Sequence, residues 1–352
     1  MAYTTINKST DYFNTKLYTG NGSAGNAQTG VGFQPDFTWI KARAGTQGTQ
    51  SHILNDAVRG AGKFLYSDSS DAESTDTNRL TSFNADGFTV GSNNSTNASS
   101  TTYASWNWKA GGSGSSNSDG SITSTVSANT TAGFSIVKYT GTGADMTVGH
   151  GLGAVPKMII VKALSTGSDP WWTYHASLGN SAKLRLNGTQ ASQTTSDYIW
   201  NQTDPTSSVF SLDGTNQGSN ANGNDFIAYC FAEKTGFSKF GSYTGNGNAD
   251  GTFVYTGFKP AYVTIKRTNN TSDWHHFDNK RGDPVNNGGW DYLKLNTSDV
   301  ESTASGRVDF LSNGFKLRYA TGNLNENGDS FIYNSFAEAP LVGTNNVPCT
   351  AR

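Results

Sequence analysis

One pattern occurs three times along the chain and constrains any fold that the chain can adopt. The tripeptide Tyr-Thr-Gly begins at Tyr18, Tyr139 and Tyr243. In each copy a proline follows 17 positions later and a lysine 23 positions later, as Pro35, Pro156 and Pro260 and as Lys41, Lys162 and Lys266. Copies at intervals of 121 and 104 residues indicate that one unit of about a hundred residues was repeated.

The composition is typical of an all-β protein with many turns. Charged residues make up 15% of the 352 residues, against a typical quarter, and there are 41 glycines. Disordered chains are poor in aromatic residues, whereas this one has 8 Trp, 15 Tyr and 19 Phe, which must be buried or presented to a partner. A net charge of -2 gives no reason to expect nucleic acid as a partner.

Short apolar segments separated by Gly/Asn turns, without helical periodicity, predict short β-strands throughout. We therefore expect an all-β fold of three tandem β-sandwich repeats of jelly-roll type, each about 100 residues long. The repeats should span 1–110, 133–235 and 236–339, with a Gly/Ser/Thr-rich linker at 111–132 and an extended tail at 340–352. The linker is either flexible or, at 122–126, a strand added to the next sheet. Because only 234–236 separate the second and third copies, these two should form a rigid pair, with the first attached more loosely.

Hairpins and strand faces can be predicted in more detail. Asp86-Gly87 and Asn313-Gly314 are strong hairpin signals, each flanked by phenylalanines. The first and last aromatic residues of each copy's final strand lie five positions apart, so the two should lie on opposite faces. One then faces the core, and the other a second layer or the outside, unless a bulge resets the register. These pairs are Tyr103/Trp108, Phe226/Phe231 and Phe331/Phe336.

The repeated proline and lysine have structural explanations. Proline cannot donate to a strand ladder, so each should mark the start of a strand and not its middle. Each lysine ends an apolar strand, where such a side chain usually extends to solvent or protects an edge. Asp-x-x-Arg-Gly at 56–60 recurs at 278–282 but not in the second copy, so a role for it cannot extend to all three.

Neither a secretion signal nor a membrane span is predicted. The N-terminus has no basic segment followed by an apolar core, and the longest aliphatic run, at 158–161, is too short to cross a bilayer. Cys230, inside a predicted strand, and Cys349, in the tail, form no disulfide framework. We interpret Cys230 as a small buried hydrophobic residue.

Motifs for catalysis are lacking in the sequence, which has no P-loop, nucleotide-binding glycine pattern, nucleophile elbow or zinc-ligand spacing. His275 and His276 are adjacent, and in a strand they would point to opposite faces, which makes a poor metal site. Glu233 and Glu338 end equivalent strands of different copies, so we interpret them as structural repetition and not as a glycosidase pair. We therefore expect no enzyme activity and no catalytic residues.

Calcium is the only cofactor that stays open. Two segments are rich in the oxygen ligands that calcium takes, one with Asp68, Asp71, Glu73 and Asp76, the other with Asn323, Asn325, Glu326, Asn327 and Asp329. The alternative, which we favour, is that these side chains stabilise turns through their own hydrogen bonds.

Aromatic residues that follow the central strands of the second and third copies are the best candidates for a binding site. They lie in segments predicted as loops or loop edges, and they are Trp171, Trp172, Trp274, Trp290 and Tyr292. Burial in a core is one interpretation, and an exposed platform for a sugar or a protein partner is the other.

Four stretches carry a family resemblance that covers essentially the whole chain: MAYTTINKSTDYFNTKLYTGNGSAGN, SANTTAGFSIVKYTGTG, FAEKTGFSKFGSYTGNG and VPCTAR. They are similar to a repeat family of virion structural and tail-fibre-like proteins of marine tailed bacteriophages, cyanophages among them. The resemblance implies a non-enzymatic virion component, assembled in the host cytoplasm, with other virion proteins as partners. It implies a homo-oligomer, which would be a trimer if the protein is a fibre.

The first functional hypothesis is a tail-associated adhesin that binds a host-surface glycan or protein. A head-decoration or other structural subunit is the alternative, because the sequence has no coiled coil, collagen-like repeat or obvious tail-anchoring domain. A glycan depolymerase is a minor alternative. We interpret the stretch 243–266 as a folding signature, so binding specificity should lie C-terminal to this stretch in each copy, where the copies differ.

Overall fold

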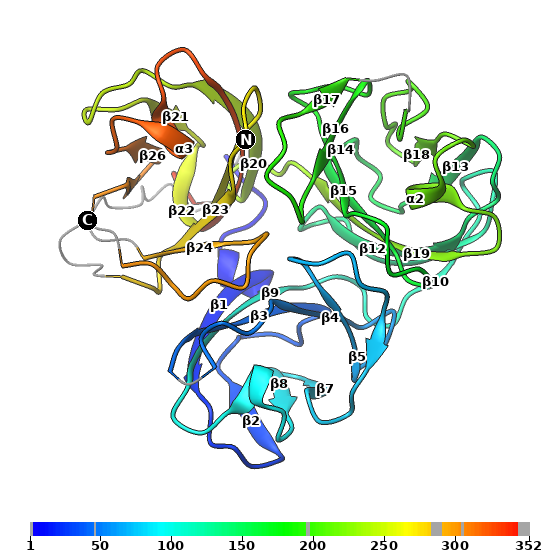
Figure 1. The fold of residues 1–352 in the computed structure, drawn as a ribbon, viewed down its shortest axis with the longest axis horizontal. Coiled ribbons are helices and arrows are strands. Elements are labelled where there is room, and N and C mark those ends of the chain that lie inside the picture. Colours follow the sequence, from blue (N-terminus) through cyan, green and yellow to red (C-terminus); the bar gives the residue numbers. More distant parts are fainter. Residues whose placement is uncertain (1–2, 46, 195–197, 283–290, 304–305, 344–352) are drawn as a thin grey trace.

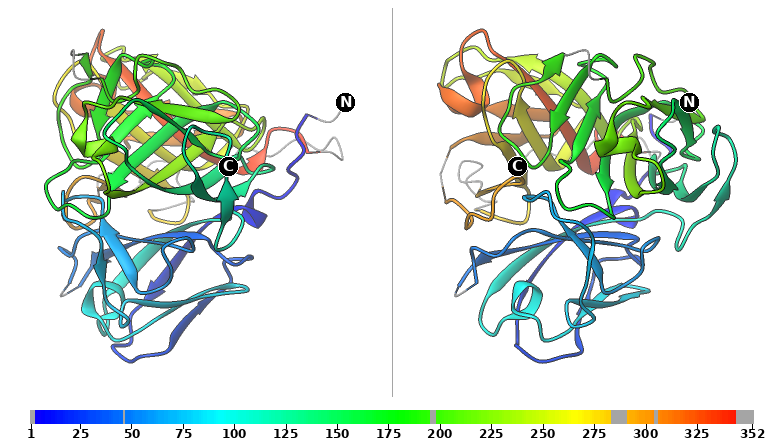
Figure 2. Two further views of the ribbon diagram at one scale, coloured as in Figure 1. Left: turned by 90° about the vertical axis from the view of Figure 1, so that its right-hand side faces the viewer. Right: turned by 45° about the vertical axis from the view of Figure 1, so that its right-hand side comes forward.

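The computed structural model describes residues 3–45, 47–194, 198–282, 291–303 and 306–343. Its antiparallel sheets form three units around a common centre (Figure 1). The first unit packs beneath the other two when the molecule is seen from the side (Figure 2). Helices are limited to short turns: a 3-10 turn η1 (Ser9–Asp11) and the one-turn helices α1 (Asn94–Asn97), α2 (Gln217–Asn220) and α3 (Gly322–Asn325). The prediction of an all-β repeat fold is confirmed.

The first unit pairs a six-stranded sheet with a three-stranded one. In spatial order the larger sheet contains β1 (Phe13–Thr19), β9 (Thr102–Trp108), β3 (Phe37–Ala44), β4 (Ile53–Asp56), β5 (Lys63–Tyr66) and β6 (Ser74–Thr75). The smaller sheet contains β2 (Asn26–Thr29), β8 (Gly87–Val90) and β7 (Leu80–Asn84).

The second unit has the largest sheet because the segment between the first two copies adds to it. The order is β10 (Ser115–Asn117), β11 (Ser124–Asn129), β12 (Phe134–Thr140), β19 (Asp225–Ala232), β14 (Pro156–Ala163), β15 (Trp172–His175), β16 (Ala182–Arg185) and β17 (Gln193–Thr194). Its smaller sheet pairs β13 (Met146–Gly149) with β18 (Val209–Leu212). The predicted linker therefore supplies strands, which is the second of the two alternatives raised for it.

The third unit repeats the first with fewer strands. Its larger sheet contains β20 (Ser238–Thr244), β27 (Ser330–Pro340), β22 (Phe258–Arg267), β23 (Trp274–Asp278) and β24 (Tyr292–Lys294). Its smaller sheet contains β21 (Phe253–Tyr255), β26 (Gly314–Leu317) and β25 (Val308–Leu311).

The Tyr-Thr-Gly signature fastens one end of each unit. In the first unit the Tyr18 hydroxyl donates to the carbonyl of Thr96 in α1 at 2.7 Å. The last residue of α1, Asn97, accepts the backbone N–H of Asn21 on its Oδ1 at 2.9 Å. A Cβ at Gly20 would lie 2.2 Å from a carbonyl oxygen, so only glycine fits there. The same hydrogen bonds join Tyr139 to Ser219, Asn220 to Thr142, Tyr243 to Leu324 and Asn325 to Asn246.

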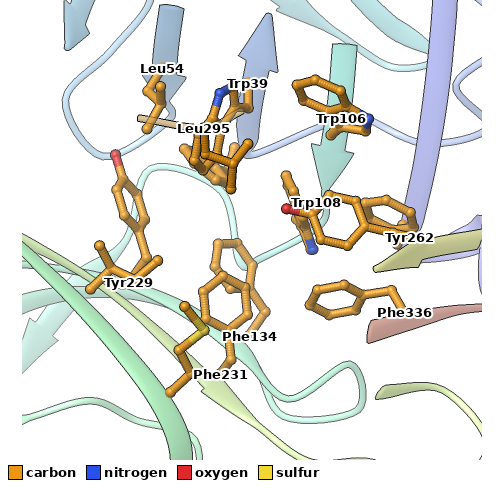
Figure 3. Packing of buried hydrophobic residues seen from close by; sticks show 14 of the residues in the cluster. Trp39, Leu54, Trp106, Trp108, Phe134, Tyr229, Phe231, Tyr262, Leu295 and Phe336 are labelled. Atoms are coloured by element: carbon orange, nitrogen blue, oxygen red, sulfur yellow. The ribbon is translucent and has the colours of Figure 1, made fainter. Parts of the chain in front are cut away.

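Each unit has its own apolar core between its two sheets, and all three share a central core on the far side of the larger sheets. The aromatic pairs confirm the prediction of opposite faces: the first member lies in the unit's own core and the last in the central one. The three last members meet at the centre (Figure 3), with ring centroids 6.4 Å apart for Trp108 and Phe231, 5.9 Å for Phe231 and Phe336, and 5.6 Å for Trp108 and Phe336. The second layer raised as an alternative is thus the neighbouring units.

A cyclic set of backbone hydrogen bonds closes the ring of units. Glu73 N donates to Leu164 O at 3.0 Å, Ser192 N to Thr268 O at 2.7 Å, and Glu301 N to Arg43 O at 3.1 Å. Each acceptor lies two residues after a repeated lysine, so the three bonds are equivalent. The expectation of a loosely attached first unit is wrong, because the first unit contributes to the central core and bonds to both others.

The hairpin prediction is confirmed, whereas the proline prediction holds in two units of three. Asn84 pairs with Gly87 and Leu311 with Gly314 across two-residue turns. Pro35 precedes β3 and Pro156 begins β14, but Pro260 is the third residue of β22. The register of β22 against β27 shifts on both sides of Pro260. A bulge thus accommodates a proline inside this longer strand.

The helices and Cys230 bear on the predictions about membrane spans and cysteines. Within the described residues, no helix has the length and apolar character needed to span a bilayer. Cys230 is fully buried in the second unit's core, as expected of a small hydrophobic residue, and burial raises the pKa of its thiol far above the usual range. Cys349 lies outside the described residues.

Candidate functional site

The candidate tryptophans that the structure describes, considered either as core residues or as an exposed platform, are buried. Trp171 and Trp274 each donate an indole N–H to a carbonyl of the preceding unit, Tyr66 O at 2.8 Å and Arg185 O at 2.9 Å. His52, at the equivalent position of the first unit, contacts Lys294 O at 3.0 Å. These side chains therefore join neighbouring units, and the core interpretation holds for both tryptophans.

The remaining candidates differ from one another. Trp172 is buried in the second unit's own core, so it too is no platform, and the Lys183 ammonium lies 5.1 Å from its ring centroid. Trp290 lies outside the described residues. Tyr292 is half-buried, and the Arg307 guanidinium stacks between it and Tyr319, 4.8 Å and 4.4 Å from the two ring centroids. Among the candidates within the described residues, only this last group reaches the surface.

The repeated lysines correct another expectation, because they are fully buried and do not extend to solvent. Lys162 Nζ donates to Asp169 O of its own unit and to Ser70 O of the first unit, both at 3.0 Å. Lys266 likewise bonds Ser272 O and, at 2.9 Å, Thr189 O of the second unit, whereas Lys41 bonds two carbonyls within the first unit. Burial lowers the pKa of each ammonium to about 8. Backbone carbonyls, mostly from loops, accept from these ammonium groups, and for Lys162 and Lys266 they come from two units, which the pattern of a single strand cannot reveal.

The Asp-x-x-Arg-Gly motif also lies at an interface between two units, which we call a joint. Asp278 accepts from Arg281 Nε at 2.6 Å and from Trp106 of the first unit at 2.8 Å. Burial by itself would raise the pKa of the Asp278 carboxyl, but the Arg281 guanidinium outweighs it and holds the pKa well below its usual range. Asp56, Arg59 and Tyr229 repeat this arrangement between the first and second units.

The second unit, which lacks the motif, replaces it with a histidine. His175 occupies the position of the aspartate, and its Nε2 contacts Tyr333 O of the third unit at 3.2 Å. The departure of the second copy from the motif therefore changes the chemistry of one joint and not its location.

The oxygen-rich segments considered for calcium stabilise turns. Asp76 accepts from the Asn78 backbone at 2.8 Å and from the Asn93 side chain at 2.7 Å. Asn325 likewise holds the turn after Tyr243 by accepting the backbone N–H of Asn246. Where the chain is described, three or more His, Cys, Asp or Glu side chains do not gather in a position to hold a metal ion.

A different set of aromatic residues is exposed. Phe253 and Tyr255 on β21 are 44% and 52% exposed, and both face outward from the third unit's smaller sheet. Tyr3 packs beside them, since its hydroxyl donates to Gly257 O at 2.7 Å. Burial, and then the hydrogen bond with Tyr255, raises the pKa of Tyr3 to about 12. We call Tyr3, Phe253 and Tyr255 the aromatic rim.

Strand register shows that the aromatic rim is specific to the third unit. Tyr255 pairs with Gly314, as Thr29 pairs with Gly87 and Gly149 with Val209. By the same register the counterparts of Phe253 are Ala27 and Thr147. A Cβ at Gly314 would lie 3.2 Å from Phe253 Cε2, so the phenylalanine ring covers this glycine. The aromatic side chains are thus an addition that the sandwich itself does not need.

Charged side chains lie next to the aromatic rim. Lys316, which pairs with Phe253, reaches Asp250 at 2.5 Å, and Arg318 lies between Asp250 at 3.2 Å and Asp309 at 2.5 Å. The Lys316 hydrogen bond lowers the pKa of the exposed Asp250 carboxyl. Aromatic faces bordered by paired charges can stack on a ligand and donate or accept hydrogen bonds, but they form no acid–base or nucleophilic constellation.

Sequence reasoning missed Phe253 and Tyr255, which lie inside the stretch 243–266 that we interpreted as a folding signature alone. A signal was present: both aromatics flank Val254 in a short alternating strand where the other copies have AQT and TVG. Comparing the copies position by position inside the signature would have found them.

These observations define the class of protein: an all-β chain folded as a closed ring of three related sandwiches, with an aromatic rim on one of them. A family model described as "Domain of unknown function (DUF7483)" matches residues 8–340, and the chain belongs to this family. The search of curated proteins finds no match. The family description names no activity.

Proposed function

We propose that the protein is a non-enzymatic binding and structural protein of a bacteriophage virion, a tail-associated adhesin that contacts its receptor through the aromatic rim. The observation that carries the proposal is the exposure of Phe253 and Tyr255 in a protein that buries most of its large aromatics. Exposed aromatic residues at one surface are typical of interaction sites. The resemblance of the sequence to tail-fibre-like proteins supplies the virion context.

The buried joints between the units support a scaffolding role for the rest of the molecule. The repeated polar groups form hydrogen bonds within and between the three units. They are the lysines, the Asp–Arg pairs and the N–H groups of Trp171 and Trp274, and they stabilise the ring. A rigid ring presents the rim with little conformational entropy to lose on binding, which favours affinity.

The test is adhesion of fluorescently labelled protein to host cells. Replacing both Phe253 and Tyr255 by alanine should reduce binding about tenfold or more, since each tenfold loss corresponds to about 1.4 kcal/mol of contact energy. The matched control is Thr29→Ala, at the counterpart of Tyr255 in the first unit, and it should bind like the natural protein. Unchanged adhesion of the double variant would rule out the rim as the receptor site.

A head-decoration subunit is the second candidate, favoured by the compact closed ring. Under this alternative the labelled protein fails to bind host cells but adds back to stripped capsids. Release of reducing sugars from host polysaccharide would instead revive the depolymerase.

A further inference from the structure

The smaller sheet of the second unit carries an added segment of the chain along its outer edge. Ser121 N donates to Thr147 O at 3.0 Å, and Thr147 N donates to Ser121 Oγ at 2.9 Å. Ser124 Oγ donates to Gly149 O at 3.0 Å. Ile122 forms an isolated parallel bridge with Val148, so residues 121–124, which lead into β11, lie alongside β13 in parallel orientation.

In the residues that the structure describes, the same edge of the third unit is open. Leu317 N bonds Thr252 O and Thr256 N bonds Asn313 O, so the alternating ladder directs the backbone groups of Phe253 and Tyr255 away from β26. These two residues are the counterparts of Thr147 and Gly149. Within the described part of the chain, no donor or acceptor meets their outward backbone groups.

The difference follows from the chain's connections. The second unit is preceded by the long segment 111–132, which lies across its sheets, whereas only 234–236 precede the third unit. At the open edge two aromatic side chains replace the small residues of the other copies. Exposed edges are usually short, charged or covered, because an open edge recruits other strands.

We propose that the open edge of β21 binds an extended peptide segment of a partner protein, in the parallel register in which 121–124 adds to β13. The inference rests on the proposed function and deepens it, because it names the receptor's chemistry as a largely uncharged polypeptide strand rich in Ser and Thr. Main-chain hydrogen bonds to Phe253 and Tyr255 supply affinity, and the two aromatic side chains pack against alternate side chains of the added strand.

The probe is a synthetic peptide with the sequence of residues 118–126, SDGSITSTV, blocked at both ends and added to the full-length protein. Amide hydrogen exchange is followed by NMR or mass spectrometry. The amides of Phe253 and Tyr255 should exchange about tenfold more slowly with peptide than without, because exchange requires the added strand to dissociate. A scrambled peptide is the control, and equal protection by both peptides would overturn the proposal.

Two variants at one position separate backbone recognition from ring stacking. Phe253→Ala removes the ring, and Phe253→Pro removes the ring and the outward N–H while sparing the ladder with β26. Peptide affinity should fall several-fold in the alanine variant and about tenfold further in the proline variant, since a lost hydrogen bond costs about 1 kcal/mol or more. Ala27→Pro, at the counterpart in the first unit, should leave the affinity unchanged.

The peptide affinities of the variants test whether the backbone of β21 binds the added strand. Equal affinities of the alanine and proline variants would show that the backbone edge is not used, and would overturn the proposal. If Phe253→Pro unfolds, Tyr255→Pro offers the second outward N–H, and the exchange result on the natural protein stands independently. Host-cell adhesion that requires the rim, in a protein that does not bind the peptide, would refute the inference while leaving the proposed function in place.

Discussion

The centre of the ring and the aromatic rim use equivalent positions of the three units in opposite ways. At the centre Trp108, Phe231 and Phe336 are all aromatic and all buried, because each is packed by the other two. At the rim Phe253 has counterparts as small as Ala27, and nothing in the fold demands an aromatic residue there. Positions shared between units are constrained by common packing, whereas rim positions are free to diverge. A difference between copies at the rim is therefore a better guide to function than one at the centre.

The largest expected contrast comes from truncating an aromatic residue in each place. Trp108→Ala should lower the free energy of unfolding by about 3–5 kcal/mol, through lost burial and a cavity that three units line. Phe253→Ala should change it by less than about 0.5 kcal/mol, as is usual for an exposed side chain. Denaturant unfolding measures both. Similar losses for the two variants would contradict the division between centre and rim.

A second contrast compares two arginines that each form ion pairs with two carboxylates. Arg281 is fully buried between Asp278 at 2.6 Å and Glu301 at 2.9 Å, whereas Arg318 is exposed beside Asp250 and Asp309. Arg281→Met leaves buried carboxylates without their partner and should cost about 3 kcal/mol of unfolding free energy. Arg318→Met should cost less than about 1 kcal/mol, because exposed pairs contribute little. A larger loss for Arg318 would mean that the rim is also part of the folding core.

The last contrast concerns how the stability depends on pH, and it is read from one buried histidine at a time. Burial lowers the pKa of His175 to about 4, and burial likewise lowers the pKa of His275 and His276 to about 4, against 6.5 for an ordinary histidine. The unfolded chain thus binds more protons between pH 6.5 and 4, and stability should fall as the pH falls through this window. Thermal unfolding at pH 7, 5.5 and 4.5 measures the loss. His175→Asn should make the fall in stability less steep, because the lowered pKa values of the other buried histidines remain, and an identical slope in this variant would remove His175 as a contributor.

Local pattern was enough to predict the repeat, the strands and the opposite faces of the paired aromatics. Two residues five apart on a strand without a bulge, such as Tyr103 and Trp108, lie on different faces, and the hairpin near Asp86-Gly87 is specified by adjacent residues alone. The burial of Lys162 could not be predicted in this way. Its second acceptor, Ser70 O, is supplied by another unit 92 positions away in the sequence.

The residues of the candidate site likewise include some features that local pattern predicts and others that depend on distant segments. Sequence left open whether Trp171 and Trp274 are core or platform, because their segments resemble loops and the carbonyls that accept from their N–H groups belong to preceding units. Phe253 and Tyr255 were present in the sequence as an alternating pair, yet only the closed ring shows which aromatics remain uncovered.

The sequence by itself determined a threefold repeat, an all-β architecture and a tyrosine–glycine signature that fastens each unit, because these depend on contacts within a unit and on strand periodicity. The tertiary structure alone decided that the three units close into a ring around one core, and that among the described residues the edge of β13 is covered while that of β21 is open. Both depend on where distant segments come to lie, and long-range packing is not encoded in the spacing of neighbouring residues.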